Sequence, residues 1–119
     1  MMINQLEIPM YLEEALPAIS KELTVSKNSS AYDAMHTLID FTCRNIKAHN
    51  FNIVKRCFQI ADKLYSKGNN AVKNAVQNVF VFSFTKIFQT YSAEKQDLLA
   101  IIPMTLYSLY LAQVHHRGC

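Results

Sequence analysis

The residues best suited to metal chemistry lie in the C-terminal run His115–Cys119, which holds two adjacent histidines and a cysteine. Such side chains are common zinc ligands, but adjacent residues on a helix point about 100° apart and cannot easily share one ion. His49, at another predicted helix end, is a further candidate ligand, although nothing in the sequence places it nearby. We therefore expect His115 and His116 to be solvated groups favoured by the helix dipole, with no bound metal or cofactor.

Two internal cysteines, Cys43 and Cys57, are the candidate nucleophiles. Both fall on predicted apolar helix faces, where cysteine usually acts as a small hydrophobic residue. A catalytic thiol needs a lowered pKa and a nearby base, whereas the flanking Arg44 and Arg56 would face other directions on a helix. Three cysteines without paired spacing also indicate a reducing compartment and no disulfide framework, so we expect a cytoplasmic protein.

The other common catalytic arrangements are missing. Glu13 and Glu14 are consecutive and would diverge on a helix, so they offer no carboxylate pair for acid–base catalysis. With two glycines in all, the chain has no glycine-rich phosphate loop and no Walker motif. No apolar run is long enough to cross a membrane, and the N-terminus has neither the basic start nor the apolar stretch of a signal peptide. We expect neither an enzyme nor a membrane protein.

Charge is sorted along the chain, and this is the main indication of a partner. Residues 1–40 contain six acidic and two basic side chains, whereas residues 41–92 contain eight basic side chains and a single acidic one, Asp62. Residues 93–119 are neutral as a whole, so the formal net charge of +3 hides the division.

The elements that must position these charges are predicted to be helices. The 119 residues are half apolar and include only two glycines and three prolines, which favours one all-α domain spanning residues 1–119. Five to six helices are expected, in an antiparallel bundle or a short α–α superhelix. They cover a short or kinked segment within residues 3–23, then residues 31–49, 52–67, 70–91, 93–101 and a final helix beginning at Pro103.

The helix over residues 52–67 has the clearest pattern, with apolar residues from Val54 to Tyr65 at helical spacing and a polar opposite face. We expect Gly68 to end it in the left-handed conformation. Its start, Asn52-Ile53-Val54-Lys55, is repeated as Asn70-Ala71-Val72-Lys73, which suggests two stacked helices, each capped by its asparagine. Residues 70–91, which begin with the second copy, are expected to form one central helix, because apolar residues cover most of its circumference. A strand at residues 79–84 is the alternative, but it would have no partner strand.

The inward-facing residues of the two terminal segments follow from the same spacing. Those expected to be buried are Leu12, Leu16 and Ile19 near the N-terminus, and Leu106, Tyr107, Tyr110, Leu111 and Val114 in the final helix.

The candidate binding surface is the outward side of the helix over residues 52–67, with the end of the helix before it. Its members are Arg44, Lys47, Lys55, Arg56, Gln59, Lys63 and Lys67. An acidic protein surface is one possible partner. Nucleic acid is another, with Phe41, predicted to lie off the core, as a stacking platform. The third possibility is internal: the acidic N-terminal segment packs over these bases and neutralises them.

Two runs, His49–Asn52 and Ser66–Val76, resemble the helix junctions of small all-helical proteins from bacterial polymorphic-toxin neighbourhoods. The proline-started final helix at Ile101-Ile102-Pro103 occupies the corresponding place, so the resemblance covers roughly residues 30–117. It implies a non-enzymatic immunity or interaction role. Antidotes to nucleases in that setting are generally acidic, whereas this core is basic, which implies a toxin that is acidic or not a nuclease. We therefore expect a protein-binding module, with nucleic-acid binding as the alternative.

Overall fold

The computed structural model describes residues 3–4, 7–19 and 31–117, with side chains described as far as residue 114. The described residues form an all-α fold, as the sequence predicts, and their one β-type contact is an isolated bridge between Ile3 and Gly68. The elements in chain order are α1 (Ile8–Ala15), η2 (Pro17–Ile19), α3 (Ala31–Lys47), α4 (Phe51–Lys67), α5 (Asn70–Ala75), η3 (Val76–Val81), α6 (Phe84–Thr90), η4 (Ser92–Glu94), α7 (Lys95–Ile101) and α8 (Met104–Arg117).

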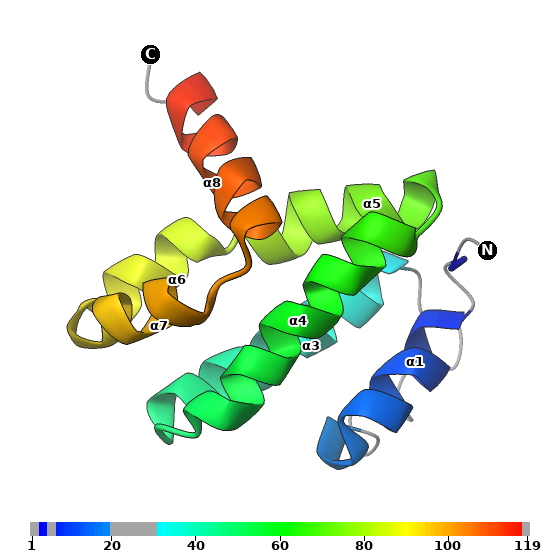
Figure 1. Ribbon diagram of the computed structural model, residues 1–119, viewed down its shortest axis with the longest axis horizontal. Coiled ribbons are helices and arrows are strands. Elements are labelled where there is room, and N and C mark those ends of the chain that lie inside the picture. The colour runs from blue at the N-terminus through cyan, green and yellow to red at the C-terminus, as the bar shows by residue number, and fades with distance from the viewer. Residues whose placement is uncertain (1–2, 5–6, 20–30, 118–119) are drawn as a thin grey trace.

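Helices α3 and α4 form an antiparallel pair, with α1 beside α4, and the α5–η3–α6 segment runs at an angle away from the end of α4 (Figure 1). Three phenylalanines join these layers: the rings of Phe58 on α4, Phe80 on η3 and Phe84 on α6 meet edge to face, with centroids 5.6–6.0 Å apart. All three side chains are buried. Such contacts add to the burial of apolar surface, so this cluster is the centre of the core.

The turn between α3 and α4 is short because the chain reverses through one left-handed residue. His49 has φ 61°, and α3 ends at Lys47, two residues earlier than expected. The amide of Asn50 donates to the carbonyl of Asn45, and the amide of His49 donates to that of Ile46. This pair of bonds is a Schellman motif, in which glycine usually holds the left-handed position.

The far end of α4 closes differently from our expectation. Gly68 does end the helix, but its φ of −79° is not left-handed, so that prediction was wrong. A Cβ atom at Gly68 would overlap the carbonyl oxygen of Leu64 and the side chain of Val72. Glycine is needed here because Leu64 and Val72 approach its α-carbon closely. Next to it, the Ile3 amide donates to the carbonyl of Lys67 at 2.7 Å.

The internal repeat predicts the packing of α4 and α5 but not their caps. Its equivalent apolar positions are all buried: Val54 and Val72, Cys57 and Ala75, Phe58 and Val76, Ala61 and Val79. The capping residues lie one or two positions earlier than Asn70 and Asn52. Asn69 caps α5 by accepting from the amide of Val72 at 3.1 Å, while Asn50 precedes α4 without a side-chain cap.

The segment expected to be one central helix is central but interrupted. After α5, residues 76–81 form a π-helical turn, and Phe82 and Ser83 form a break before α6. Val79, Phe80 and Val81 are consecutive and buried, as expected of a helix packed on several sides. The Ser83 hydroxyl donates to the carbonyl of Val79 at 2.7 Å. The same carbonyl also accepts from the Ser83 amide at 3.2 Å, so the hydroxyl adds a second bond at the break before α6.

The two terminal segments give a mixed outcome. Leu12, Leu16 and Ile19 are buried as predicted, whereas α8 is rotated relative to the predicted face. Leu106 is buried, but Leu111 and Val114 are exposed, because Gln113 faces η3 and its amide donates to the carbonyl of Gln77 at 2.8 Å. Among the described helices, none combines the length and apolarity needed to cross a membrane.

Candidate functional site

The predicted binding residues occupy the outward side of α4 and the last turn of α3. We call this surface the basic face, and all of its members are exposed: Arg44, Lys47, Lys55, Arg56, Gln59, Lys63 and Lys67. Three of them, Arg56, Gln59 and Lys63, are brought together at one hollow of about 240 Å³ between α1 and α4. Spacings of three and four residues on one helix explain that grouping.

The hollow has an aromatic wall contributed by α1. Tyr11 and Ala15 line it together with Ile60, and the Lys63 ammonium lies 5.5 Å from the centre of the Tyr11 ring. At this distance a cation–π interaction orients the lysine side chain without neutralising its charge. The N-terminal segment therefore covers one edge of the basic face.

The acidic residues of α1 do not neutralise that face in the described structure. Glu13 and Glu14 are exposed, and Glu7 is engaged locally, where it accepts from the amide of Asn4 at 3.2 Å. Within the described residues, no carboxylate lies at ion-pair distance from Lys47, Lys55, Arg56, Lys63 or Lys67. Residues 20–30, which include Glu22, lie outside the described part of the chain.

The single acid of the basic stretch is partly withdrawn from the surface. Asp62 is half-buried, and its Oδ1 atom is shielded from solvent, with no hydrogen-bond partner among the described residues. The exposed charge of α4 is consequently more uniformly positive than the sequence count suggests.

Part of the basic face has a structural explanation. Arg44 and Lys47 lie in the last turn of α3, and Lys67 lies in the last turn of α4, where positive charge favours the helix dipole. The Arg44 guanidinium also lies 5.9 Å from the ring of Phe41. Phe41 itself is buried, so its proposed role as an exposed stacking platform was wrong. Lys55 and Arg56, in the body of α4, are explained neither by the helix dipole nor by a contact with an aromatic ring.

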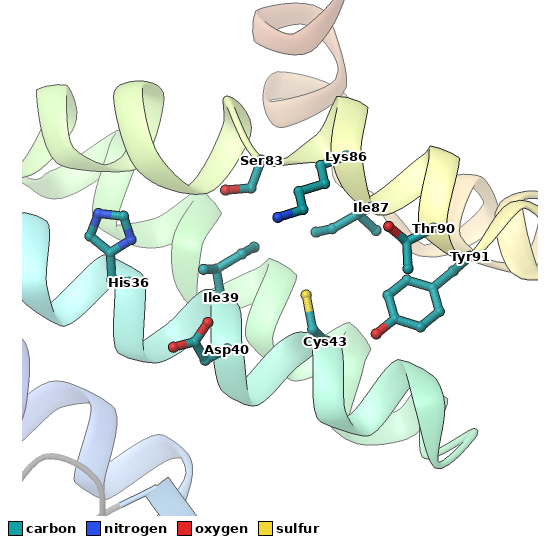
Figure 2. Close-up of a pocket in the computed structure, with 9 residues that line it drawn as sticks. All are labelled: His36, Ile39, Asp40, Cys43, Ser83, Lys86, Ile87, Thr90 and Tyr91. Carbon is teal, nitrogen blue, oxygen red and sulfur yellow. The ribbon is translucent and has the colours of Figure 1, made fainter.

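A second site, which the sequence analysis missed, is a cleft of about 350 Å³ between α3 and α6 (Figure 2). Each helix contributes residues at spacings of three, four and seven, which is one helix face. That shared spacing was a readable signal, but only the packed structure shows that the two faces meet. The lining residues are His36, Ile39, Asp40 and Cys43 from α3, and Ser83, Lys86, Ile87, Thr90 and Tyr91 from α6 and its flanks.

Cys43 lies in the wall of this α3–α6 cleft, half-buried, with its thiol turned into the gap (Figure 2). Burial raises the pKa of the Cys43 thiol, and the charge of Asp40 raises it further, while Lys86 opposes the shift. Burial also raises the pKa of Tyr91. A raised pKa leaves little thiolate at neutral pH, so the arrangement disfavours a nucleophilic role for Cys43.

The remaining chemical candidates have local roles. Cys57 is buried, which raises the pKa of its thiol to about 11 although a side-chain hydrogen bond with Thr42 lowers it. His49 lies beside Glu94 at 3.9 Å and meets Phe51 edge to face. The described residues contain no group of three or more histidine, cysteine or acidic side chains arranged for a metal ion. The side chains of His115 and His116, and all of Cys119, lie outside that description.

Comparison with known protein families identifies the family of this chain. A family model described as Domain of unknown function (DUF7674) matches residues 9–116, from the start of α1 to the end of α8. The chain belongs to this family. Searches of curated proteins and of solved structures found no match. The DUF7674 assignment therefore covers both the basic face and the α3–α6 cleft, and it carries no activity with it.

Proposed function

We propose that this DUF7674 protein is a non-enzymatic binding module whose basic face captures an acidic surface of a protein partner. The observation that carries the proposal is the exposure of Lys55 and Arg56 in the body of α4, without a carboxylate partner among the described residues. Positive charge concentrated on one surface steers association with an oppositely charged partner and rejects like-charged ones.

The hollow beside Lys63 supports a protein partner in particular. Arg56 and Lys63 flank it, Tyr11 forms its aromatic wall, and Ile60 supplies apolar surface. Arginine and tyrosine are enriched at the energetically important centres of protein interfaces. A partner carboxylate can enter between the two bases while its neighbouring carbons contact Tyr11 and Ile60.

An immunity role is the more specific form of this proposal, and it rests on the resemblance to polymorphic-toxin neighbourhood proteins. In that form the partner is a toxin with an acidic surface. The test is co-expression with a growth-arresting product of an adjacent gene. Wild-type protein restores growth, whereas Lys55→Glu/Arg56→Glu does not; restoration by that variant would overturn the role of the basic face.

Capture experiments need a charge-matched control, which the chain provides. Lys73→Glu/Lys95→Glu makes the same change in formal charge on α5 and α7, outside the residues of the basic face. These lysines lie over the rings of Tyr65 and Phe88, so the melting temperature of the control is measured as well. We expect Lys55→Glu/Arg56→Glu to weaken partner binding at least about tenfold, because like charges opposed across an interface cost several kcal/mol. The control should bind as the wild type does, and equal losses in both variants would reduce the effect to net charge.

Nucleic acid is the second candidate, favoured by the same cluster of bases. It predicts a mobility shift of DNA or RNA at low salt that fades steeply as salt rises, because phosphate neutralisation releases counterions. The burial of Phe41 removes the expected stacking platform, which weakens this alternative. A salt-sensitive shift abolished by Lys55→Glu/Arg56→Glu but retained by the control would establish it over the protein partner.

A further inference from the structure

The α3–α6 cleft presents two opposite charges that do not neutralise each other. Asp40 contributes a carboxylate from α3, and Lys86 contributes an ammonium from α6. The structure shows no ion pair between these two described residues. Figure 2 shows the Lys86 ammonium directed toward the space above Ile39. The cleft is therefore dipolar, with separate places for a positive and a negative group.

The pairing of charges decides the class of ligand. A simple anion would be attracted by Lys86 but repelled by Asp40, and a simple cation would meet the reverse. Both charged side chains are exposed, so a neutral molecule would leave them to water and gain nothing from either charge. A zwitterion with its two charges a short distance apart satisfies Asp40 and Lys86 together.

The size and the remaining lining narrow the class further. A volume of about 350 Å³ is at the lower end for small-molecule sites. Ile39 and Ile87 supply apolar surface between the charged groups. The Ser83 hydroxyl, beside Lys86, donates its proton to the carbonyl of Val79 and so adds polar surface to the α6 wall without a free proton for the ligand (Figure 2). We propose that the α3–α6 cleft binds a zwitterionic α-amino acid with an apolar side chain, its ammonium on Asp40 and its carboxylate on Lys86.

Two further observations support this assignment. Asp40 and Lys86 act in opposite directions on the pKa of the same Cys43 thiol, so both charges are felt at one point in the cleft wall. The π-helical turn at residues 76–81 precedes the α6 face. A residue more or less in that turn would rotate α6 by roughly 100° and carry Lys86 away from α3. Such turns recur near functional sites.

The test is an NMR titration of the ¹⁵N-labelled full chain with L-leucine and two truncated analogues. 4-Methylpentanoate lacks the amino group, and isopentylamine lacks the carboxylate. L-Leucine should shift amides around Asp40 and Lys86 with a Kd of about 1 mM or tighter, while each analogue binds at least about tenfold more weakly, because each loses a charge-assisted hydrogen bond.

Variants separate this site from general effects of charge. Asp40→Asn and Lys86→Met should each weaken L-leucine binding about tenfold or more, with unchanged melting temperature. Asp97→Asn and Lys95→Met, on exposed positions of α7, should leave it unchanged. The proposal is overturned if L-leucine causes no shifts in the cleft, if 4-methylpentanoate binds as tightly as L-leucine, or if the two cleft variants bind normally. Because no residue lines both sites, failure here leaves the proposed role of the basic face standing.

Discussion

The basic face and the α3–α6 cleft differ in how their charges are arranged. The basic face spreads exposed bases over the outward side of one helix, with Asp62 half-buried. The cleft sets Asp40 and Lys86 on two different helices, with a thiol and hydroxyls elsewhere in its lining. One surface thus matches the extended charge of a macromolecule, and the other matches the paired charges of a small molecule.

The difference has a structural origin. Helix α4 has an ordinary amphipathic pattern, so its outward residues follow from the sequence of one element. The cleft exists only because the interrupted α5–η3–α6 segment brings α6 against α3. A surface formed by one helix can therefore be predicted from the sequence of that helix, whereas a site between two helices also depends on how each helix is rotated toward the other.

Removal of Phe84 has the largest expected effect, because both regions depend on the same aromatic core. Its ring contacts Phe58 on α4, Phe80 on η3, and Phe88 and Tyr110 farther along the chain. Phe84→Ala should lower the free energy of unfolding by about 3–5 kcal/mol in urea denaturation.

The neighbouring Phe82 is the matched control, since half of its side chain is exposed. Phe82→Ala should cost no more than about 1 kcal/mol, as expected of a largely solvent-facing position. Equal losses in the two variants would contradict the placement of the core at Phe84. Separate unfolding transitions for the basic face and the cleft would show that the two regions do not depend on one core.

The next largest effect is a loss of stability at high pH, caused by Cys57, with Cys43 as the comparison. Burial raises the pKa of Cys57 to about 11 from an ordinary value of 9.0, so the folded state favours the neutral thiol. Stability is therefore complete below pH 9 and is lost as the pH rises through about 11, by up to about 2–3 kcal/mol. The measurement is the free energy of unfolding by urea across this range.

Cys57→Ala should remove most of that dependence, whereas Cys43→Ala, at the half-buried wall of the cleft, should retain it. A residual slope is expected in both variants, from Tyr91 in each and from Cys43 in Cys57→Ala, because the pKa values of these two groups are also raised. An unchanged slope in Cys57→Ala would show that its thiol does not set the dependence.

The end of α4 that carries Lys67 should be sensitive to a single methyl group. A Cβ atom at Gly68 would overlap Leu64 and Val72, so Gly68→Ala should cost about 1–3 kcal/mol through overpacking. Ser66→Ala, two residues earlier and exposed, should change the free energy of unfolding by less than about 0.5 kcal/mol. A neutral Gly68→Ala would mean that the close approach can relax without cost.

The smallest effect should be an increase in stability at the opposite end of α4. His49 occupies the left-handed position of the α3–α4 turn, which costs a residue with a side chain about 1 kcal/mol relative to glycine. His49→Gly should therefore raise the free energy of unfolding by about that amount, reduced by the loss of its contacts with Glu94 and Phe51. Asn50→Gly, outside the left-handed position, should not stabilise; a destabilised His49→Gly would mean that those contacts outweigh the strain.

Much of the fold was predictable from periodicity, particularly α3, α4 and the buried positions of the internal repeat. The errors arose where tertiary contacts override a local pattern. Gly68 is required by the approach of Val72 rather than by its backbone angle, and Leu111 is exposed because Gln113 pairs with η3. Neither contact is visible in the sequence of the helix concerned.

The candidate surfaces were predictable to different degrees. The exposure of Lys55 and Arg56 followed directly from the helical pattern of α4, whereas the partial burial of Asp62 did not. The cleft was missed altogether, because the matching faces around Asp40 and Lys86 are 46 positions apart in a chain of 119 residues and meet only after folding. The π-helical turn η3 determines which face of α6 lies against α3, and such turns have no simple sequence signature.

The most direct test of the central claim is the footprint of the captured protein partner on the ¹⁵N-labelled chain. We predict that amide signals of α4 around Lys55, Arg56 and Lys63 shift or broaden, while those around Asp40 and Lys86 remain unchanged. The Lys73→Glu/Lys95→Glu control should give the same footprint. A footprint confined to the α3–α6 cleft or to α8, with α4 unaffected, would contradict the assignment of the basic face as the partner-binding surface.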